Sequence, residues 1–259
     1  MIFAGLDVGS RTIALVLLDG EVFDSAIIDT GSMPLQRCHK LLSNRSYQKL
    51  IVTGYGRYLV APTLKGEVIS EIGAYAAGAS YLYPDCGTVI DIGGQDSKVI
   101  SLSTTGTVRK FEMNDRCAAG TGKFLEVMAS TLEVNIGEFG KFALGASKTV
   151  QINSLCTVFA ESEVVSLIAR GEESTAIALA LHQAIATRIS GMIRRVGIKE
   201  KVIFAGGVAQ NECLRQLLSD KLGAEITVPA EPQIVGALGA ALLAKQGKEQ
   251  KHIVNSQTN

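Results

Sequence analysis

The sequence lacks an excess of charge of either sign, since its 25 lysine and arginine residues balance 25 aspartate and glutamate residues. Proteins that bind nucleic acid or an anionic membrane usually gather basic residues, so we expect neither partner. No apolar run reaches the roughly 18 uninterrupted residues typical of a transmembrane helix. Asp7 interrupts the N-terminal apolar stretch before a signal-peptide core is complete. We therefore expect a cytoplasmic protein.

Cysteine and histidine are also scarce. The five cysteines form no C-x-x-C pair, and the three histidines do not stand at zinc-ligand spacings from them. In a reducing compartment we expect neither a disulfide framework nor a mononuclear zinc site. We expect three cysteines to be small buried hydrophobes, namely Cys38, Cys86 and Cys213.

Cys117 and Cys156 have different surroundings, because each stands just ahead of a predicted helix. They occur in the stretches N-D-R-C-A-A-G-T-G and S-L-C-T-V-F-A-E. Full cysteine ligation of a four-iron, four-sulfur cluster needs four thiolates. One chain offers two cysteines in such settings, so a symmetric dimer would supply the other two.

The rest of the chain predicts an α/β protein with an internal repeat. A β-meander over residues 2–6, 13–18 and 21–28 recurs as strands 89–92, 98–102 and 107–111. Other strands are expected at 49–52, 201–204 and 225–228, and helices at 35–42, 67–81, 119–132, 159–170, 173–196, 211–222 and 234–245. We expect residues 1–85 and 86–259 to form two lobes around a shared cleft, with the helix at about 234–245 able to pack back on the first lobe.

One D-x-G turn follows the first strand of each half. The two turns are Asp7-Val8-Gly9-Ser10 and Asp91-Ile92-Gly93-Gly94. Glycine allows backbone N–H groups to approach a polyphosphate, and a carboxylate at the strand end can hold magnesium through water. We expect Asp7 and Asp91 in that role, with Asp7 also catalytic. The turns add candidates for nucleotide binding, namely Gly9, Ser10, Arg11, Thr12, Gly93 and Gly94. Gln95 and Asp96 are further catalytic candidates, which could orient the hydrolytic water or the metal shell.

A single D-x-G sequence is most simply a hairpin turn, but here two copies are followed by Ala205-Gly206-Gly207-Val208-Ala209. This combination resembles the actin, hexokinase and Hsp70 superfamily of ATPases. The resemblance implies that the two turns bind the nucleotide phosphates from opposite lobes. The expected contacts on the adenosine side are Gly206, Gly207, Val208 and Gln233. A P-loop is excluded, because Phe124 follows Gly122-Lys123 where serine or threonine is required.

Longer motifs narrow the family. The stretches N-D-R-C-A-A-G-T-G-K-F from Asn114, S-L-C-T-V-F-A-E-S-E from Ser154, D-I-G-G-Q-D-S-K from Asp91, G-Y-G-R from Gly54 and A-G-G-V-A-Q-N from Ala205 are similar to the activators of 2-hydroxyacyl-CoA dehydratases. ATPase subunits of benzoyl-CoA reductase and reductases of double-cubane cluster proteins belong to the same family. The resemblance implies a homodimer that binds ATP or ADP, magnesium and one 4Fe-4S cluster, with Cys117 and Cys156 of each subunit as ligands.

The predicted helix from Ala119 would point its positive end at Cys117 and stabilise a thiolate. The resemblance implies ATP-driven transfer of one electron from a ferredoxin or flavodoxin to a larger iron-sulfur enzyme. A dehydratase is the preferred partner, with a double-cubane protein or a benzoyl-CoA reductase as alternatives. Two other functions stay open at this point: a small-molecule kinase without a cluster, with Asp7 or Asp96 as base, and a non-catalytic ATP-dependent regulator.

Overall fold

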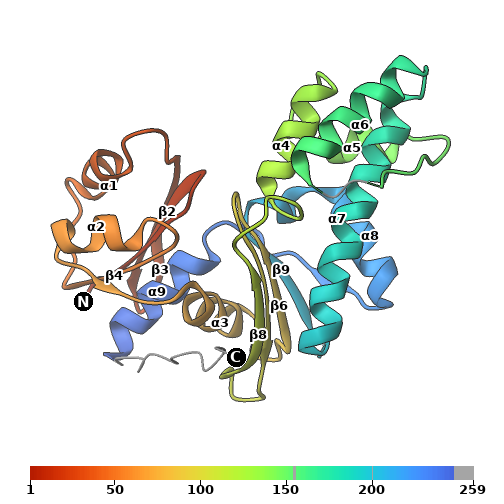
Figure 1. Cartoon of the computed structure of the whole chain (residues 1–259). Coiled ribbons are helices and arrows are strands. Elements are labelled where there is room, and N and C mark those ends of the chain that lie inside the picture. Colours follow the sequence, from red (N-terminus) through yellow and green to blue (C-terminus); the bar gives the residue numbers. More distant parts are fainter. Residues whose placement is uncertain (154–155, 200, 248–259) are drawn as a thin grey trace, which may run out of the picture.

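The computed structural model describes residues 1–153, 156–199 and 201–247, and this part of the chain contains two five-stranded mixed sheets (Figure 1). The first sheet has the order β3-β2-β1-β4-β5 and is built from β1 (Phe3–Val8), β2 (Thr12–Asp19), β3 (Glu21–Asp29), β4 (Lys49–Thr53) and β5 (Glu67–Val68). The second has the order β10-β9-β6-β7-β8 and is built from β6 (Thr88–Ile92), β7 (Ser97–Leu102), β8 (Val108–Asn114), β9 (Val202–Ala205) and β10 (Ile226–Thr227).

The helices divide between the two sheets. The first lobe carries α1 (Pro34–Leu42) and α2 (Arg57–Leu64). The second carries α4 (Gly122–Thr131), α5 (Phe139–Leu144), α6 (Thr157–Ala169), α7 (Ser174–Val196) and α8 (Glu212–Leu222). Two further helices, α3 (Glu71–Leu82) and α9 (Val235–Gln246), lie between the sheets (Figure 1).

The two sheets have the same topology, which confirms the predicted duplication. In each, a central strand pairs antiparallel with the strand that follows it and parallel with a strand that arrives later in the chain. Each central strand carries an aspartate at or near its end. Asp7 pairs with Thr53 across β1 and β4, and Asp91 pairs with Ala205 across β6 and β9. The repeat thus places two equivalent carboxylates, one in each lobe, facing the same cleft.

The last helix joins the first lobe. Apolar residues of α9 pack on β1, β2 and β4, where Ala237, Leu238 and Ala241 cover Val16 and Leu18. Helix α3 packs against α9 on one side. On the other side it contributes Tyr75 and Ala79 to the core of the second sheet. Because α3 touches both cores, it connects the two lobes beneath the cleft.

Helix α7 is the long core helix of the second lobe. This 23-residue helix is apolar enough to cross a membrane by length and composition alone, but 67% of its apolar 18-residue window is buried inside the protein. Ile177, Leu181, Ile185 and Ile189 pack in the main hydrophobic cluster with the second sheet and α4. The hydrophobicity of α7 is therefore explained by core packing.

Two short helices, α2 and α5, were absent from the predicted elements. Helix α2 has eight residues and contains Pro62, which removes a backbone donor and resembles a loop signal in the sequence. The helix predicted from residue 67 begins instead at Glu71, because the Ser70 side chain caps it by accepting a hydrogen bond from the N–H of Gly73 at 3.2 Å. Glu67 and Val68 form the edge strand β5.

The helix predicted from Ala119 begins three residues later, at Gly122. Residues 118–121 form a turn, in which the backbone N–H and the hydroxyl of Thr121 both donate to the carbonyl of Ala118, at 3.0 and 2.7 Å. Gly120 has a φ of +87°, which favours glycine and breaks helical geometry. Cys117 therefore lies in a loop that precedes α4 rather than at its first turn.

Candidate nucleotide site and cysteine loops

A cavity of about 780 Å³ lies between the lobes. It is lined by both D-x-G turns and by the loop after β9, so the structure brings together every residue predicted for nucleotide and magnesium binding: Asp7, Gly9, Ser10, Arg11, Thr12, Asp91, Gly93, Gly94, Gln95, Asp96, Gly206, Gly207, Val208 and Gln233. Gln210 donates a side-chain hydrogen bond to Gln233 at 3.1 Å beside the glycine pair. Gln95 is exposed at the tip of its turn.

The two aspartates are held close to glycine backbone. Gly54 has a φ of +90°, and a Cβ there would overlap Asp7 Oδ1. Gly206 has a φ of +84°, and a Cβ there would overlap Asp91 Oδ1. Any other residue at these positions would strain the backbone and displace the carboxylate. In each lobe, therefore, the glycine that follows the parallel partner of the central strand leaves room for the aspartate of that central strand.

Burial changes the acidity of both carboxyl groups. Asp7 is 8% exposed, and burial, reinforced by the charges of Glu71 and Asp91, raises its pKa to about 8. Asp91 is 1% exposed, and burial raises its pKa to about 6 although the charge of Lys98 opposes the shift. In the described part of the chain the buried Asp91 Oδ1 has no hydrogen-bond partner. Both groups thus lack full compensation by positive charge.

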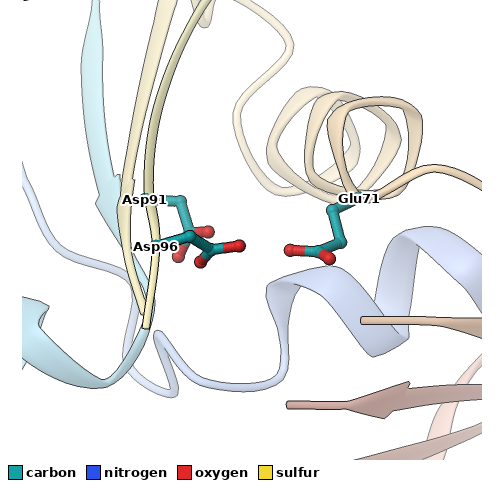
Figure 2. A group of neighbouring side chains, drawn as sticks. All are labelled: Glu71, Asp91 and Asp96. Carbon is teal, nitrogen blue, oxygen red and sulfur yellow. The ribbon is translucent and has the colours of Figure 1, made fainter. Parts of the chain in front are cut away.

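Lys98 lies at the centre of a carboxylate cluster. Its Nζ is 2.6 Å from Glu71 Oε2, 2.8 Å from Asp96 Oδ1 and 3.0 Å from Asp91 Oδ2. Burial lowers the pKa of Lys98, but these three charges outweigh burial and hold the pKa above its ordinary value. Figure 2 shows Glu71 reaching from α3 toward Asp91 and Asp96 on the opposite side of the cleft. The cluster therefore spans both lobes.

Glu71 and Lys98 were not predicted as site residues, although the sequence contained a signal for Lys98. A strand-turn-strand hairpin with its turn at residues 93–96 pairs Asp91 with Lys98 in register. Lys98 is also the one charged residue of β7. Nothing in the sequence pattern indicated Glu71, because its place depends on how α3 packs between the lobes.

The donor set fits magnesium. Glu71, Asp91 and Asp96 each offer an oxygen, and these oxygens lie within 4.8 Å of one another. Mg²⁺ prefers oxygen ligands and retains several waters, so it binds through a few carboxylates together with substrate phosphates. The unpartnered Asp91 Oδ1 and the buried Asp7 carboxyl are the groups that a hydrated cation would satisfy.

The second phosphate turn is bonded directly to α4. The N–H groups of Gly122 and Lys123 donate to the carbonyls of Gly93 and Gly94, both at 2.8 Å. These are the first two residues of α4. Because these bonds tie the turn to the helix, a shift of the turn on binding phosphate would move the beginning of α4 with it.

The five cysteines separate into the two predicted groups. Cys38, Cys86 and Cys213 are buried, and burial raises their thiol pKa values to about 11, 12 and 12. Cys117 is half-buried and Cys156 is exposed. Only these last two cysteines are accessible enough to bind a shared metal group.

Asn114 holds the Cys117 loop in place. Its side-chain Nδ2 donates to the carbonyls of Cys117 and Ala119 at 2.9 and 3.0 Å, and its Oδ1 accepts a 3.4 Å hydrogen bond from Arg188. In the described residues no acceptor is found for the backbone N–H groups of residues 118–120. Such free donors at a thiol-bearing loop suit an anionic iron-sulfur cluster.

Cys156, unlike Cys117, stands directly at the N-terminus of a helix. Cys117 precedes the first residue of α4 by five positions, and the first two N–H groups of α4 donate to Gly93 and Gly94, so stabilisation of a Cys117 thiolate by that helix end stays a prediction. Cys156 is the N-cap residue of α6, and its carbonyl accepts the N–H of Ala160 at 2.8 Å. The positive end of α6 therefore faces Cys156. Ser154 and Leu155, part of the motif around Cys156, lie outside the described residues.

The model of the BadF/BadG/BcrA/BcrD ATPase family matches residues 4–244. The chain belongs to this ATPase family. It is 42% identical over 250 residues to the (R)-2-hydroxyglutaryl-CoA dehydratase activating ATPase of Acidaminococcus fermentans, a match that covers 93% of this chain and 95% of the relative. It is 40% identical to the 2-hydroxyisocaproyl-CoA dehydratase activator of Clostridioides difficile, over 97% of this chain and 98% of the relative.

A more distant family member belongs to the benzoyl-CoA reductase of Thauera aromatica, and it is 28% identical over 96% of this chain and 98% of the relative. Among solved structures, the activator of 2-hydroxyisocaproyl-CoA dehydratase from Clostridium difficile with bound ADPNP superposes with a TM-score of 0.87 at 38% identity, covering 98% of this chain and 100% of that chain. A ROK family glucokinase from Streptomyces griseus has a TM-score of 0.61 at 13% identity, over 95% of this chain and 100% of that chain. This last match supports only the predicted actin-like ATPase fold, which is confirmed.

Proposed function

We propose that this protein is an ATP-dependent one-electron activator of a larger iron-sulfur enzyme. Two subunits would bind one 4Fe-4S cluster through Cys117 and Cys156 of each, and a 2-hydroxyacyl-CoA dehydratase is the preferred partner. The dehydratase activators at 40–42% identity support this partner over a benzoyl-CoA reductase, whose matching component is 28% identical. A ferredoxin or flavodoxin in the cytoplasm would be the electron donor.

The observation that carries the proposal is the connection between the nucleotide cleft and the accessible thiols. The phosphate turn accepts hydrogen bonds from the first residues of α4, and the Cys117 loop leads directly into that helix. A kinase has no need of an accessible cysteine, such as Cys117, at this connection. A bound cluster would supply low-potential one-electron transfer.

The residues of the cleft have separate tasks in this proposal. Asp7 and Asp91 hold hydrated magnesium on the nucleotide phosphates, and the backbone of both D-x-G turns binds the phosphate oxygens. Asp96 and Gln95 orient the hydrolytic water. Binding of phosphate between the turns shifts Gly93 and Gly94, and their hydrogen bonds transmit the shift to α4. The Cys117 loop then changes position, so the state that can dock a partner is populated with nucleotide bound.

Anaerobic purification tests the cluster. The wild-type dimer should be brown and contain about four irons. Cys117→Ala and Cys156→Ala should lose the iron while they still bind ADP. Cys213→Ala is the matched control, because Cys213 is buried in α8 and this variant should retain the iron. A colourless wild-type protein that phosphorylates a small metabolite would refute the proposal in favour of a kinase.

A reconstitution assay tests the partner. The iron-loaded protein, ATP, a reduced ferredoxin and the purified large component of a 2-hydroxyacyl-CoA dehydratase should together dehydrate the hydroxyacyl-CoA substrate. Replacing ATP by ADP should abolish the reaction. If the iron-loaded protein activates a double-cubane protein or a benzoyl-CoA reductase but no dehydratase, the dehydratase assignment is wrong while the electron-transfer function stands.

A further inference from the structure

We propose that Lys98 keeps divalent cations out of the empty cleft, so that a cation enters only together with nucleotide phosphates. This inference rests on the proposed ATPase site and assigns a positioning role to a residue of that site. The ammonium group of Lys98 stands between three carboxylates, Glu71, Asp91 and Asp96, at 2.6–3.0 Å from each. Without it, the same oxygens would form a ready site for a hard cation.

The burial of the cluster makes the competition strong. The Lys98 side chain is 1% exposed, and Asp91 is equally buried. Interactions between charges are stronger where water is excluded. The ammonium of Lys98 and a divalent cation bound to the same oxygens would therefore repel each other strongly. The buried Asp91 Oδ1 has no partner in the described part of the chain. One ligand position thus stays available when Lys98 holds the other oxygen of the same carboxylate.

Lys98 can leave the cluster without stranding Glu71. The guanidinium of Arg57 also contacts Glu71, with Nη1 at 3.3 Å from Oε1, whereas Lys98 contacts Oε2. Arg57 is thus able to neutralise Glu71 alone. Lysine has a flexible stem and a compact charge, which allow its ammonium to move between partners. Lys98 lies two positions beyond the 93–96 turn, so phosphates bound at that turn would attract its ammonium away from Asp91 and Asp96 and open those oxygens to the cation.

Binding of Mn²⁺ alone, without nucleotide, tests the inference. The signal of free Mn²⁺ in electron paramagnetic resonance at room temperature reports how much cation the anaerobically purified protein retains, whether or not it carries iron. Wild-type protein should leave Mn²⁺ free and retain about one per subunit only after ADP is added. Lys98→Met should retain Mn²⁺ without ADP, at least about tenfold more tightly than wild type, because one competing positive charge is gone.

Two further variants separate the charge from the packing. Lys98→Arg keeps the positive charge and should exclude Mn²⁺ as wild type does. Lys110→Met is the matched control: Lys110 is exposed on the neighbouring strand β8 and donates to the carbonyl of Arg195, away from the carboxylates. This variant should also leave Mn²⁺ free. Circular dichroism verifies that each variant is folded.

If Lys98→Met does not fold, the double variant Lys98→Met with Glu71→Gln takes the place of the single variant in the test. It removes one of the buried negative charges that Lys98 would otherwise leave uncompensated. This variant should also bind Mn²⁺ without nucleotide. The inference is overturned if wild-type protein binds Mn²⁺ in the absence of nucleotide, or if a folded variant without the Lys98 charge binds no more than wild type. These outcomes do not depend on ATP hydrolysis or on the partner enzyme, so they are separate from a failure of the proposed function.

Discussion

Arg11 Nε lies 2.6 Å from Glu126 Oε1 and joins the phosphate turn of the first lobe to helix α4 of the second. The two turns are also in contact beside this pair, since a Cβ on Gly94 would lie 2.6 Å from both Arg11 Cγ and Ser10 Oγ. Helix α4 is therefore bonded to both turns, through Glu126 to the first and through the N–H groups of Gly122 and Lys123 to the second. If the cleft closes on nucleotide, these bonds would carry the movement to the helix that follows the Cys117 loop.

Glu126→Gln should weaken this transmission without unfolding the protein. The Arg11 side chain is 64% exposed, and such ion pairs contribute about 0–1 kcal/mol to stability. We expect nearly unchanged ADP affinity but a smaller effect of nucleotide on the rate at which a chelator removes cluster iron. Glu112→Gln is the control, because Glu112 pairs with Arg195 within the second lobe. Equal nucleotide effects in wild type and Glu126→Gln would show that the pair transmits nothing.

Asp91→Asn should abolish magnesium-dependent ATP hydrolysis. The substitution keeps the shape of the side chain and removes the charge that the cation requires, so we expect a fall in kcat of at least about a hundredfold. Lys98 keeps two other carboxylates, Glu71 and Asp96, and the fold should persist. Asp85→Asn removes an exposed aspartate near Lys201 and should hydrolyse ATP normally. Hydrolysis by Asp91→Asn at the wild-type rate would exclude Asp91 as the magnesium residue.

Native alkylation should distinguish the two groups of cysteines. At pH 8 the buried thiols of Cys38, Cys86 and Cys213 are shielded and almost wholly protonated, because burial raises their pKa values to about 11–12. Iodoacetamide should modify Cys117 and Cys156 in iron-free native protein and all five cysteines in denaturant. Mass spectrometry of peptides gives the sites. Rapid native modification of Cys213 would contradict the burial on which the assignment of the cysteines depends.

Asn114→Asp should loosen the Cys117 loop. The carboxylate would place oxygens against the carbonyls of Cys117 and Ala119, which now accept hydrogen bonds from the Asn114 amide. Its attraction to Arg188 does not replace these two donors. We expect faster loss of iron to a chelator, by several-fold, with unchanged ADP affinity. Asn135→Asp, in a loop before α5, serves as the control, and a variant that keeps its iron as long as wild type would refute the role of Asn114.

His182 should make the protein less stable in acid. Its ring is buried between Ala178 and Asn211, and burial lowers its pKa to about 4 although the bond to the Ala178 carbonyl opposes the shift. The unfolded chain takes up a proton near the ordinary pKa of 6.5, so the stability that neutral His182 contributes is present above that value. It is lost as the pH falls toward 4, by about 3 kcal/mol. Denaturant unfolding between pH 7 and 4 measures the loss.

His182→Gln should show a smaller loss of stability over this pH range, because glutamine does not titrate. His39→Gln is the matched control, since His39 is exposed on α1 and should leave the pH dependence unchanged. If wild type and His182→Gln lose the same free energy of unfolding between pH 7 and 4, His182 is not the source of the acid sensitivity.

Most of the fold was predictable because the signals were local. Apolar runs bounded by turn residues marked the two meanders, and the long helices α7, α8 and α9 begin and end within one residue of the predicted bounds. The start of α4 was wrong because side-chain contacts decide it: the Asn114 amide and the Thr121 hydroxyl hold residues 117–121 as a turn. Such contacts between a strand end and the next loop leave no periodic pattern in the sequence.

Local sequence signals were enough to predict the duplicated α/β architecture, the two phosphate turns of the cleft and the two cysteines set apart from the others. These follow from periodicity, turn chemistry and spacing, which act over a few residues. Tertiary structure decided the charge balance of the site. Glu71 reaches Lys98 only because α3 packs between the lobes, and Arg11 meets Glu126 only when the two phosphate turns come together. Contacts between distant parts of the chain depend on how whole elements pack, and packing is set by the complete core.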